Sequence, residues 1–461
     1  MCGIFGVRGV PQAAAVVHLG LYSLQHRGQE SAGIVAIDDD GNARVARKMG
    51  LVSDGFDGSS VEALDGALAI GHTRYSTAGS STIENAQPVL ARFRGGHIAL
   101  AHNGNLTNAT ELRRELENQG SIFSSSMDSE VLVHRLAKSS AEAPEWKLAE
   151  ALQGVEGAYS LLVVIGNTLL AARDPRGWRP LVLGRTADGA YAAASETCAL
   201  DIIGAAVVRD VEAGEIVAIG GEGMRSIKPL GHQDLRRCVF EYVYFARPDS
   251  RVFGGSVDRA RRALGRQLAI ECPATGADLV FSVPDSSNSA ALGFAEQSAL
   301  PLELALIRNH YVGRTFIQPT QSGRDAKVKV KYNAVREVLD GRSVVMVDDS
   351  IVRGTTTRGL VAMVRAAGAR EVHMRVSSAP ITGPCYYGID TPNRKELIAA
   401  NMTTDQIAAH IGVDSLGYLS LEGMLAAVPD GPSGFCHACF SGEYPTPPPT
   451  DPDKLRFGCG C

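Results

Sequence analysis

The chain has 461 residues, which is too many for a single hydrophobic core and predicts two or three domains. Hydrophobic residues make up 45% and charged residues 21%, an ordinary globular composition, and the net charge of −5 gives no basis for a nucleic-acid or membrane surface. No run of about 18 apolar residues occurs, and no basic segment followed by an apolar one opens the chain. We therefore expect a soluble cytoplasmic protein, in which nine cysteines favour reactive or metal-binding thiols over disulfides.

Short apolar runs separated by glycine-rich turns occupy the first half of the chain. They predict strands at residues 66–71, 97–101 and 159–165. Helices are expected between them, over residues 110–119 and 128–138, the second of which opens with acidic residues suited to a helix N-terminus. Strands mixed with helices in this way favour stacked sheets covered by helices.

The pattern changes near residues 225–260. Apolar runs at residues 278–282, 343–347 and 371–376 alternate with helices such as 357–367, which is the βαβ pattern of a parallel sheet. Residues 321–336 carry five basic side chains and few large apolar ones, so we expect either a mobile basic loop or a plain solvated charge run. The proline-rich end, residues 446–461, is expected to be extended.

Cys2 is the sharpest chemical feature of the sequence. Removal of Met1 would leave one residue that carries both a thiol and a free α-amine. An α-amine has a pKa of about 7.7–8.0 and can act as a base near neutral pH, while a deprotonated thiol is a strong nucleophile. The position of Cys2 alone is equally compatible with an ordinary residue of an apolar first strand. Other segments of the sequence are needed to distinguish a nucleophile from a structural residue.

Five segments in combination resemble the class II glutamine amidotransferases, which are N-terminal-nucleophile hydrolases. The segments are residues 1–6, 25–30, 71–77, 102–106 and 127–130, and the resemblance covers about residues 2–230. It implies that Cys2 attacks the side-chain carbonyl of glutamine. The side-chain amide of Asn103 and the backbone N–H of Gly104 would then hold the developing oxyanion.

Three further residues would bind the glutamine substrate in the same resemblance. Arg74 would clamp the α-carboxylate, Asp128 would bind the α-ammonium group, and Thr77 would support them. Taken singly, each segment has a plainer explanation, since Asn-Gly is a common hairpin turn and a lone charge is often a surface group or a helix cap. Their combination with Cys2 favours the catalytic explanation.

A second motif follows the expected strand at residues 343–347. Asp348 and Asp349 come at its carboxyl end, where α/β sheets bind ligands, and a loop then leads into a helix. Loop amides and hydroxyls at a helix N-terminus can cradle phosphate, and the two carboxylates can bind ribose hydroxyls or help to hold Mg²⁺. The alternative is a strand followed by an acidic helix cap, and a Walker phosphate loop is absent.

Residues 344–356 resemble the phosphoribosyl pyrophosphate motif of the type I phosphoribosyltransferases. Residues 241–250, 283–286 and 309–317 extend the resemblance to the amidophosphoribosyltransferase family, which covers nearly the whole chain to about residue 445. The implied phosphoribosyl pyrophosphate ligands are Asp348, Asp349, Ser350, Arg353, Gly354, Thr355 and Thr356. Ser286, Asp348 and Asp349 would form one magnesium site per subunit, and the 321–336 loop would close over the phosphates and help to channel ammonia.

The resemblance implies a reaction in which glutamine, water and phosphoribosyl pyrophosphate give phosphoribosylamine, glutamate and pyrophosphate, the first committed step of purine synthesis. The implied fold is a four-layer αββα glutaminase domain (2–230), a doubly wound α/β phosphoribosyltransferase domain with C-terminal helices (231–445), and an extended tail (446–461). A homotetramer inhibited by purine nucleotides is also implied.

Three other protein classes share part of these motifs. An asparagine synthetase should carry a Ser-Gly-Gly pyrophosphate loop, and a sugar-phosphate aminotransferase should carry sugar-isomerase domains. A non-catalytic phosphoribosyl-pyrophosphate-sensing regulator should have a basic DNA-binding domain. The sequence has none of these features, and it has an intact glutaminase set.

Cys436 and Cys439 form a C-x-x-C pair, which alone fits a zinc half-site, a redox pair or two packed thiols. In part of the resembling family, Cys238 and Cys385 complete a structural four-cysteine [4Fe–4S] site with this pair, one cluster per subunit, although four thiolates suit zinc equally well. Relatives with the cluster commonly carry a propeptide before the catalytic cysteine, where this chain has only Met1. We assign no role to the cysteines of the tail.

Overall fold

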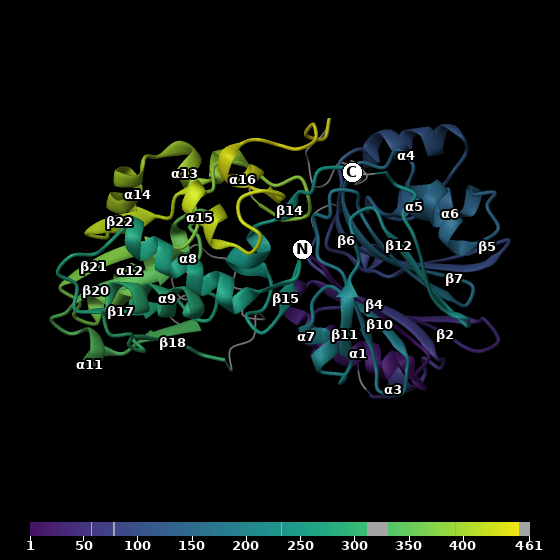
Figure 1. Ribbon diagram of the computed structural model, residues 1–461, viewed down its shortest axis with the longest axis horizontal. Helices are drawn as coiled ribbons and strands as arrows, with labels where there is room; N and C mark the ends of the chain where they lie inside the picture. Colours follow the sequence, from purple (N-terminus) through teal and green to yellow (C-terminus); the bar gives the residue numbers. More distant parts are fainter. Residues whose placement is uncertain (57, 77–78, 232, 311–330, 392, 451–461) are drawn as a thin grey trace.

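The computed structural model describes residues 1–56, 58–76, 79–231, 233–310, 331–391 and 393–450. Its two halves lie side by side, and the chain starts at the junction between them (Figure 1). Thr77, most of the 321–336 loop and the end of the tail lie outside the described residues. Within the described ranges, no helix is long and apolar enough to cross a bilayer.

Two antiparallel sheets form the first half. The seven-stranded sheet has the order β11-β9-β10-β1-β4-β2-β3 and the six-stranded sheet the order β13-β12-β8-β7-β6-β5. The first contains β1 (Gly3–Arg8), β2 (Ser31–Ile37), β3 (Ala43–Met49), β4 (Leu68–Arg74), β9 (Val182–Arg185), β10 (Tyr191–Ala194) and β11 (Ala206–Asp210). The second contains β5 (Val89–Phe93), β6 (Gly96–Leu106), β7 (Gly157–Ile165), β8 (Thr168–Arg173), β12 (Ile216–Gly220) and β13 (Gly223–Ile227).

Three apolar interfaces stack these sheets and their helices into four layers. Successive side chains of a strand point to opposite faces, so Ile4 of β1 packs between the two sheets while Phe5 packs on the helix side. Helix α1 (Ala13–Ser23) covers the outer face of the first sheet. Helices α4 (Ala109–Asn118), α5 (Glu130–Lys138) and α6 (Pro144–Leu152) cover the outer face of the second. The αββα prediction is confirmed.

A parallel sheet forms the centre of the second half, with the order β17 (Leu279–Ser282), β20 (Ser343–Asp348), β21 (Glu371–Val376) and β22 (Ser415–Tyr418). A parallel bridge from Val280 to Leu302 lies on the other side of β17. The chain therefore leaves β17 toward one edge and returns to β20 on the opposite side. This reversal of direction is a topological switch point, and the crevice at the carboxyl ends of β17 and β20 is where such sheets bind ligands.

Helices pack on both faces of this sheet. Helices α8 (Val257–Glu271) and α9 (Asn288–Ser298) share one apolar cluster with Val345, while α12 (Thr355–Ala366) shares another with Val344. Because neighbouring residues of β20 face opposite sides, both faces are covered, as expected for buried parallel strands. The prediction of a doubly wound α/β half is confirmed.

Short elements connect these layers. The helices and helical turns are η1 (Gln25–Arg27), α2 (Val52–Gly55), α3 (Gly58–Glu62), η2 (Ile83–Asn85), α7 (Cys198–Asp201), η3 (Glu241–Phe245), α11 (Arg336–Leu339), η4 (Arg394–Glu396), α13 (Ile398–Asn401), α14 (Thr404–Ile411), α15 (Leu421–Ala427) and α16 (Ala438–Ser441). The strand pairs are β14 (Arg237–Cys238) with β23 (Phe435–Cys436), β15 (Arg251–Val252) with β16 (Gly255–Ser256), and β18 (Leu306–Arg308) with β19 (Tyr332–Ala334).

A buried ion network joins the two halves. The guanidinium of Arg27 donates to Glu196 in the first half and, at 2.8 and 3.0 Å, to Glu241 in η3; all three side chains are fully shielded from solvent. Burial by itself raises the pKa of Glu196, but the neighbouring cations His26 and Arg27 bring that pKa well below its ordinary value. Arg27 also donates to the carbonyl of Cys2 at 3.0 Å, so the network places Cys2 at the junction.

Candidate active sites

Cys2 lies directly beside Asn103 of β6. The backbone N–H of Cys2 donates to Oδ1 of Asn103 at 3.3 Å, and its Sγ is 3.5 Å from the carbonyl oxygen of Tyr75. The other end of the same carboxamide, Nδ2 of Asn103, is buried and has no hydrogen-bond partner among the described residues. A buried donor without an acceptor costs about 1–3 kcal/mol, so this arrangement is favourable only when something accepts from Nδ2.

Gly104 continues the same strand with a conformation that excludes other residues. Its φ is 153°, and a Cβ at this position would come within 2.0 Å of the carbonyl oxygen of Ala158 and 2.8 Å of Nε2 of His102. Only glycine therefore fits between the carbonyl of Ala158 and the ring of His102 at this point of β6. The sequence prediction that an Asn-Gly pair forms the oxyanion hole is compatible with this geometry and stays a prediction.

Two of the three predicted glutamine-binding residues, Arg74 and Asp128, line a pocket together with Cys2. Arg74, at the end of β4, is 2% exposed, donates to the carbonyl of Ser80 at 3.0 Å and lies 3.6 Å from the carboxylate of Glu30. Asp128, opposite, accepts the backbone N–H of Leu106 at 2.8 Å. Among the described residues, the lining comprises Cys2, Arg74, Tyr75, Ser76, Gln87, His102, Gly104, Met127 and Asp128.

His102 is a pocket residue to which the sequence analysis gave no role. Its Nδ1 lies 3.7 Å from Asp128, and its backbone N–H donates to the side chain of Gln87 at 2.8 Å. Burial lowers the pKa of His102, but the Asp128 carboxylate, the carbonyl of Ala158 and Cys2 together outweigh burial, and the net effect is a raised pKa. Strand alternation was a usable signal, because it places His102 and Gly104 on the same face of β6.

Met1 fills buried space next to the nucleophile. It is 1% exposed, and its sulfur contacts the guanidinium groups of Arg27 and Arg179. Burial lowers the pKa of its α-amino group to about 6. While Met1 is attached, the nitrogen of Cys2 is an amide whose lone pair is delocalised into the carbonyl, so it cannot act as a base. Excision makes this nitrogen an amine beside Asn103. The predicted removal of Met1 would thus provide the α-amine of Cys2 as a base and would empty the buried space that the Met1 side chain fills.

The two acidic residues of the second motif lie at the switch point. Asp348 accepts from the hydroxyl of Ser287 at 3.0 Å, and Asp349 accepts from that of Ser350 at 2.7 Å. Burial and the neighbouring Asp349 charge raise the pKa of Asp348 well above its ordinary value. Burial also raises the pKa of Asp349, although a hydrogen bond from Ser286 opposes this effect. The predicted magnesium ligands are therefore together, in a position where a cation would relieve the repulsion between the two carboxylates.

The loop after these residues leads into the N-terminus of α12. Gly354 has a φ of 74°, and a Cβ there would lie 2.8 Å from the side chain of Ile398. Thr355 and Thr356 form the first turn of α12, whose exposed N–H groups suit an anion. Arg353 is paired with Glu396 at 2.9 Å on the outside of this loop.

Four cysteines meet at the junction. Cys238 of β14 pairs in register with Cys436 of β23. Burial raises the pKa of Cys238 and of Cys436, and the neighbouring Cys385 adds to both shifts. Burial and then the charges of Cys385, Cys238 and Cys436 raise the pKa of Cys439 well above its ordinary value. Within the described ranges, no set of three or more His, Cys, Asp or Glu side chains is arranged to hold a metal ion.

Known proteins match this chain along nearly its whole length. The glutamine amidotransferase domain family matches residues 72–201. Amidophosphoribosyltransferase from Bacillus subtilis is 49% identical over 451 residues, which cover 96% of this chain and 94% of that protein. The chain belongs to the amidophosphoribosyltransferase family. Chloroplastic amidophosphoribosyltransferase 2 of Arabidopsis thaliana is 47% identical over 457 residues, 99% of this chain and 81% of that protein.

A solved member of the family has the same fold. Glutamine phosphoribosylpyrophosphate amidotransferase from B. subtilis, complexed with ADP and GMP, is similar with a TM-score of 0.90 and 48% identity over 97% of this chain and 98% of that one. The family, the fold class and the enzyme class predicted from the sequence are confirmed. The roles assigned to individual residues remain predictions.

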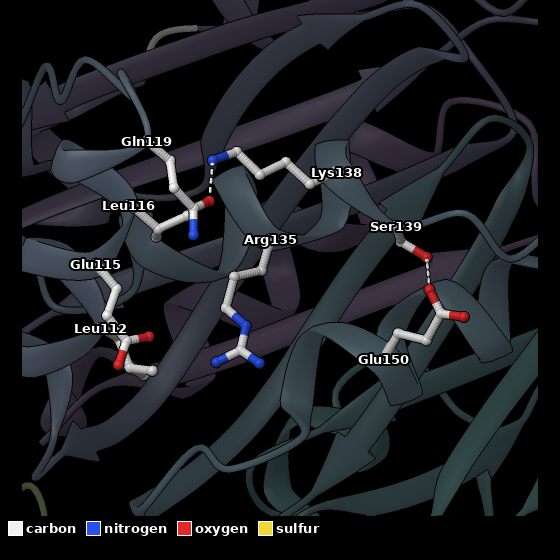
Figure 2. Close-up of a pocket in the computed structure, with 8 residues that line it drawn as sticks. All are labelled: Leu112, Glu115, Leu116, Gln119, Arg135, Lys138, Ser139 and Glu150. Atoms are coloured by element: carbon white, nitrogen blue, oxygen red, sulfur yellow. Dashed lines mark hydrogen bonds between the residues drawn. The ribbon is translucent and has the colours of Figure 1, made fainter.

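A separate pocket lies on the outer surface of the first half, between α4, α5 and α6 (Figure 2). Its polar side chains contact one another: Lys138 donates to Gln119 at 2.8 Å and Ser139 to Glu150 at 2.6 Å. None of its residues belongs to the motifs of the amidophosphoribosyltransferase family noted above. We therefore place the glutaminase chemistry in the pocket at Cys2.

Proposed function

We propose that this amidophosphoribosyltransferase releases ammonia from glutamine at Cys2 and transfers it to phosphoribosyl pyrophosphate. The products are phosphoribosylamine, glutamate and pyrophosphate. The observation that carries the proposal is the carboxamide of Asn103, whose oxygen accepts from Cys2 while its buried nitrogen has no partner among the described residues. An acyl-transfer site needs this pairing of a nucleophile with a preorganised, unoccupied donor.

The glutaminase half-reaction follows from the groups around Cys2. After removal of Met1, the α-amine of Cys2 takes the thiol proton, and Sγ attacks the side-chain carbonyl carbon of glutamine. Asn103 and Gly104 stabilise the oxyanion while the C–N bond breaks and ammonia leaves with the transferred proton. Water then attacks the thioester, the S–C bond breaks, and glutamate is released with the thiol restored. Arg74 and Asp128 hold the α-carboxylate and α-ammonium groups.

The second half-reaction belongs to the crevice at the switch point. Asp348 and Asp349 would bind the ribose hydroxyls, while the amides from Ser350 to the start of α12 would bind phosphate. The buried carboxylates of Asp348 and Asp349, which repel each other, would together with Ser286 also fit one Mg²⁺. This ion would neutralise charge on the leaving pyrophosphate. Ammonia then attacks the sugar carbon as its bond to pyrophosphate breaks.

The experiment that tests this function is a product balance. With glutamine, phosphoribosyl pyrophosphate and Mg²⁺, the purified enzyme is expected to release glutamate and pyrophosphate in equal amounts, and the amide nitrogen of labelled glutamine is expected in phosphoribosylamine. Coupled enzymatic assays of the two products measure the ratio. A protein that releases no glutamate under these conditions would instead be a non-catalytic sensor, and pyrophosphate release without glutamate would contradict the glutaminase assignment.

We propose that Cys238, Cys385, Cys436 and Cys439 hold one structural [4Fe–4S] cluster per subunit. The register of β14 with β23 supports a common site, as do the raised pKa values of Cys238 and Cys439, to which burial and then the neighbouring thiols contribute. A cluster would tie the junction to the C-terminal segment through thiolate bonds. Zinc bound by the same four thiolates is the alternative.

Metal analysis separates these two occupants. Protein purified without oxygen is expected to contain about four iron atoms and as many labile sulfides per chain. Cys436→Ser is expected to lose most of the iron, and Cys272→Ser, a matched change outside the group, is expected to keep it. Stoichiometric zinc in place of iron would reject the cluster but leave the four-cysteine site standing.

Four further properties belong to this proposal. The B. subtilis relative was solved with ADP and GMP, which supports purine nucleotides as ligands and inhibitors of this enzyme. A homotetramer and a cytoplasmic location are proposed from the family alone. The proposed closure of the 321–336 loop over the phosphates concerns residues that mostly lie outside the described part of the chain.

A further inference from the structure

We infer that Asn105 and residues 385–388 are positioning elements of the glutaminase site, through which the second half of the chain holds Asn103 and Gly104 of β6 in place. Residues 385–388 follow β21, the third strand of the parallel sheet, yet they reach across the junction to the end of β6. The inference rests on the proposed function of Gly104 as an oxyanion donor.

Gly388 packs directly on the backbone of Gly104. A Cβ at Gly388 would lie 2.9 Å from both Cα and the carbonyl carbon of Gly104, closer than real side chains approach backbone. On its other side, Gly104 approaches the carbonyl of Ala158 in β7 so closely that a Cβ would be 2.0 Å away. The Gly104 peptide is thus enclosed by β7 on one side and by Gly388 on the other.

Asn105 adds a directional contact to this packing. Its Nδ2 donates to the backbone carbonyl of Tyr386 at 2.8 Å, across 281 positions of sequence. The side chain is 5% exposed, and its Oδ1 has no partner among the described residues. Since Asn105 is bonded to Gly104, this buried hydrogen bond and the contact of Gly388 restrain the Cα and carbonyl of Gly104. They restrain the Gly104 N–H, which belongs to the preceding peptide, through that Cα.

Residues 385–388 are themselves firmly held. Arg179 donates twice to the carbonyl of Tyr387, at 3.0 and 2.5 Å, and the ring of Tyr387 stacks on Trp178 with centroids 4.5 Å apart and an angle of 20° between the planes. The N–H of Cys385 donates to the hydroxyl of Thr391 at 2.6 Å. Residues 385–388 can therefore fix the position of Gly104, because their own contacts keep them from moving away from its backbone.

Gly388→Ala and Asn105→Ala test the inference from opposite sides of the contact. Each is expected to lower kcat for glutamine hydrolysis by roughly ten- to a hundredfold, because the Gly104 N–H moves away from the oxyanion, with little change in KM for glutamine. Ammonia-supported phosphoribosylamine synthesis is expected to stay at the wild-type rate. Alkylation of Cys2 by iodoacetamide should also be unchanged, since displacement of iodide forms no tetrahedral oxyanion.

Gly412→Ala is the matched control. Gly412 also has a positive φ, 82°, but a Cβ there has no heavy atom within 4 Å, so this variant introduces the backbone strain without the clash and should keep wild-type kcat. Wild-type kcat in both Gly388→Ala and Asn105→Ala would overturn the inference. Equal losses in hydrolysis, ammonia-supported synthesis and alkylation would also overturn it, because the contact would then serve folding in general.

The outcome for Cys2→Ala separates this inference from the proposed function. If Cys2→Ala retains glutamine hydrolysis, the assignment of the nucleophile fails, and the positioning role fails with it. If Cys2→Ala is inactive while the two contact variants are unimpaired, only the positioning role is rejected.

Discussion

Cys2→Ala is expected to lower glutamine-dependent phosphoribosylamine synthesis by at least about 10⁴-fold, the loss typical when a covalent nucleophile is removed. The methyl group cannot form the thioester, and the remaining oxyanion donors have no intermediate to stabilise. Synthesis supported by ammonia should persist, since the crevice at the switch point is untouched. Initial rates with each nitrogen donor, measured through pyrophosphate release, give the comparison.

Alanine at position 2 is small, so it permits removal of Met1 and leaves processing comparable to that of the parent chain. Cys272→Ala, which removes a partly buried thiol elsewhere, should behave as wild type. Mass spectrometry of the active enzyme is expected to show a chain that begins at Cys2. Full glutamine-dependent activity in a chain that retains Met1 would contradict the role given to the α-amine.

Asp348→Asn and Asp349→Asn are each expected to lower synthesis by about 10²- to 10³-fold with glutamine and with ammonia alike. Each substitution removes a carboxylate that would bind ribose hydroxyls or Mg²⁺, and both nitrogen donors need the same acceptor sugar. The equal loss distinguishes these variants from Cys2→Ala. Asp405→Asn, an exposed position in α14, is the control and should be unimpaired.

The same two carboxyl groups make a pH dependence predictable. A carboxyl with a raised folded-state pKa contributes stability that is complete below its unfolded pKa and is lost as pH rises through its folded pKa. The contribution of this pair to the stability of the ligand-free enzyme should therefore fall as pH rises above about 4, and Asp348→Asn should reduce that loss. Thermal unfolding across this pH range measures both effects, and an inactive Asp348→Asn enzyme with no gain in Tm would reject the picture of two repelling carboxylates.

Local pattern was enough to locate the main elements of both halves. The apolar run expected at residues 343–347 is β20 (Ser343–Asp348), and the helix expected over 357–367 is α12 (Thr355–Ala366). Buried parallel strands and amphipathic helices can be predicted from the local composition and the periodicity of apolar residues, without reference to residues distant in sequence. The predicted helix at 128–138 instead begins at Glu130, because Asp128 accepts from Leu106 and does not cap the helix.

Contacts between distant segments were not predictable. The motif residues of the Cys2 site were predicted from family resemblance. The contact that supports the site from the second half was not, because no sequence pattern near Asn105 or Tyr386 indicates the hydrogen bond between them. Strand alternation tells which residues share a face, as for His102 and Gly104, but it does not tell which segment packs on that face. The pairing of Arg27 with Glu241 was not predictable either, because the two residues are distant in sequence and no local pattern relates them.

The fully shielded ion network also limits how the two halves can be exchanged between relatives during evolution or engineering. A guanidinium that loses its carboxylate partner in such surroundings costs several kcal/mol, about 3–5 in measured cases. A chimera that keeps Arg27 but takes a neutral residue at the position of Glu241 would leave Arg27 with Glu196 as its remaining carboxylate partner among the described residues, and would bear part of that penalty at its seam. The two halves carry out different reactions, but either half can be replaced without loss of stability only if the replacement keeps the charged residues that pair across the junction.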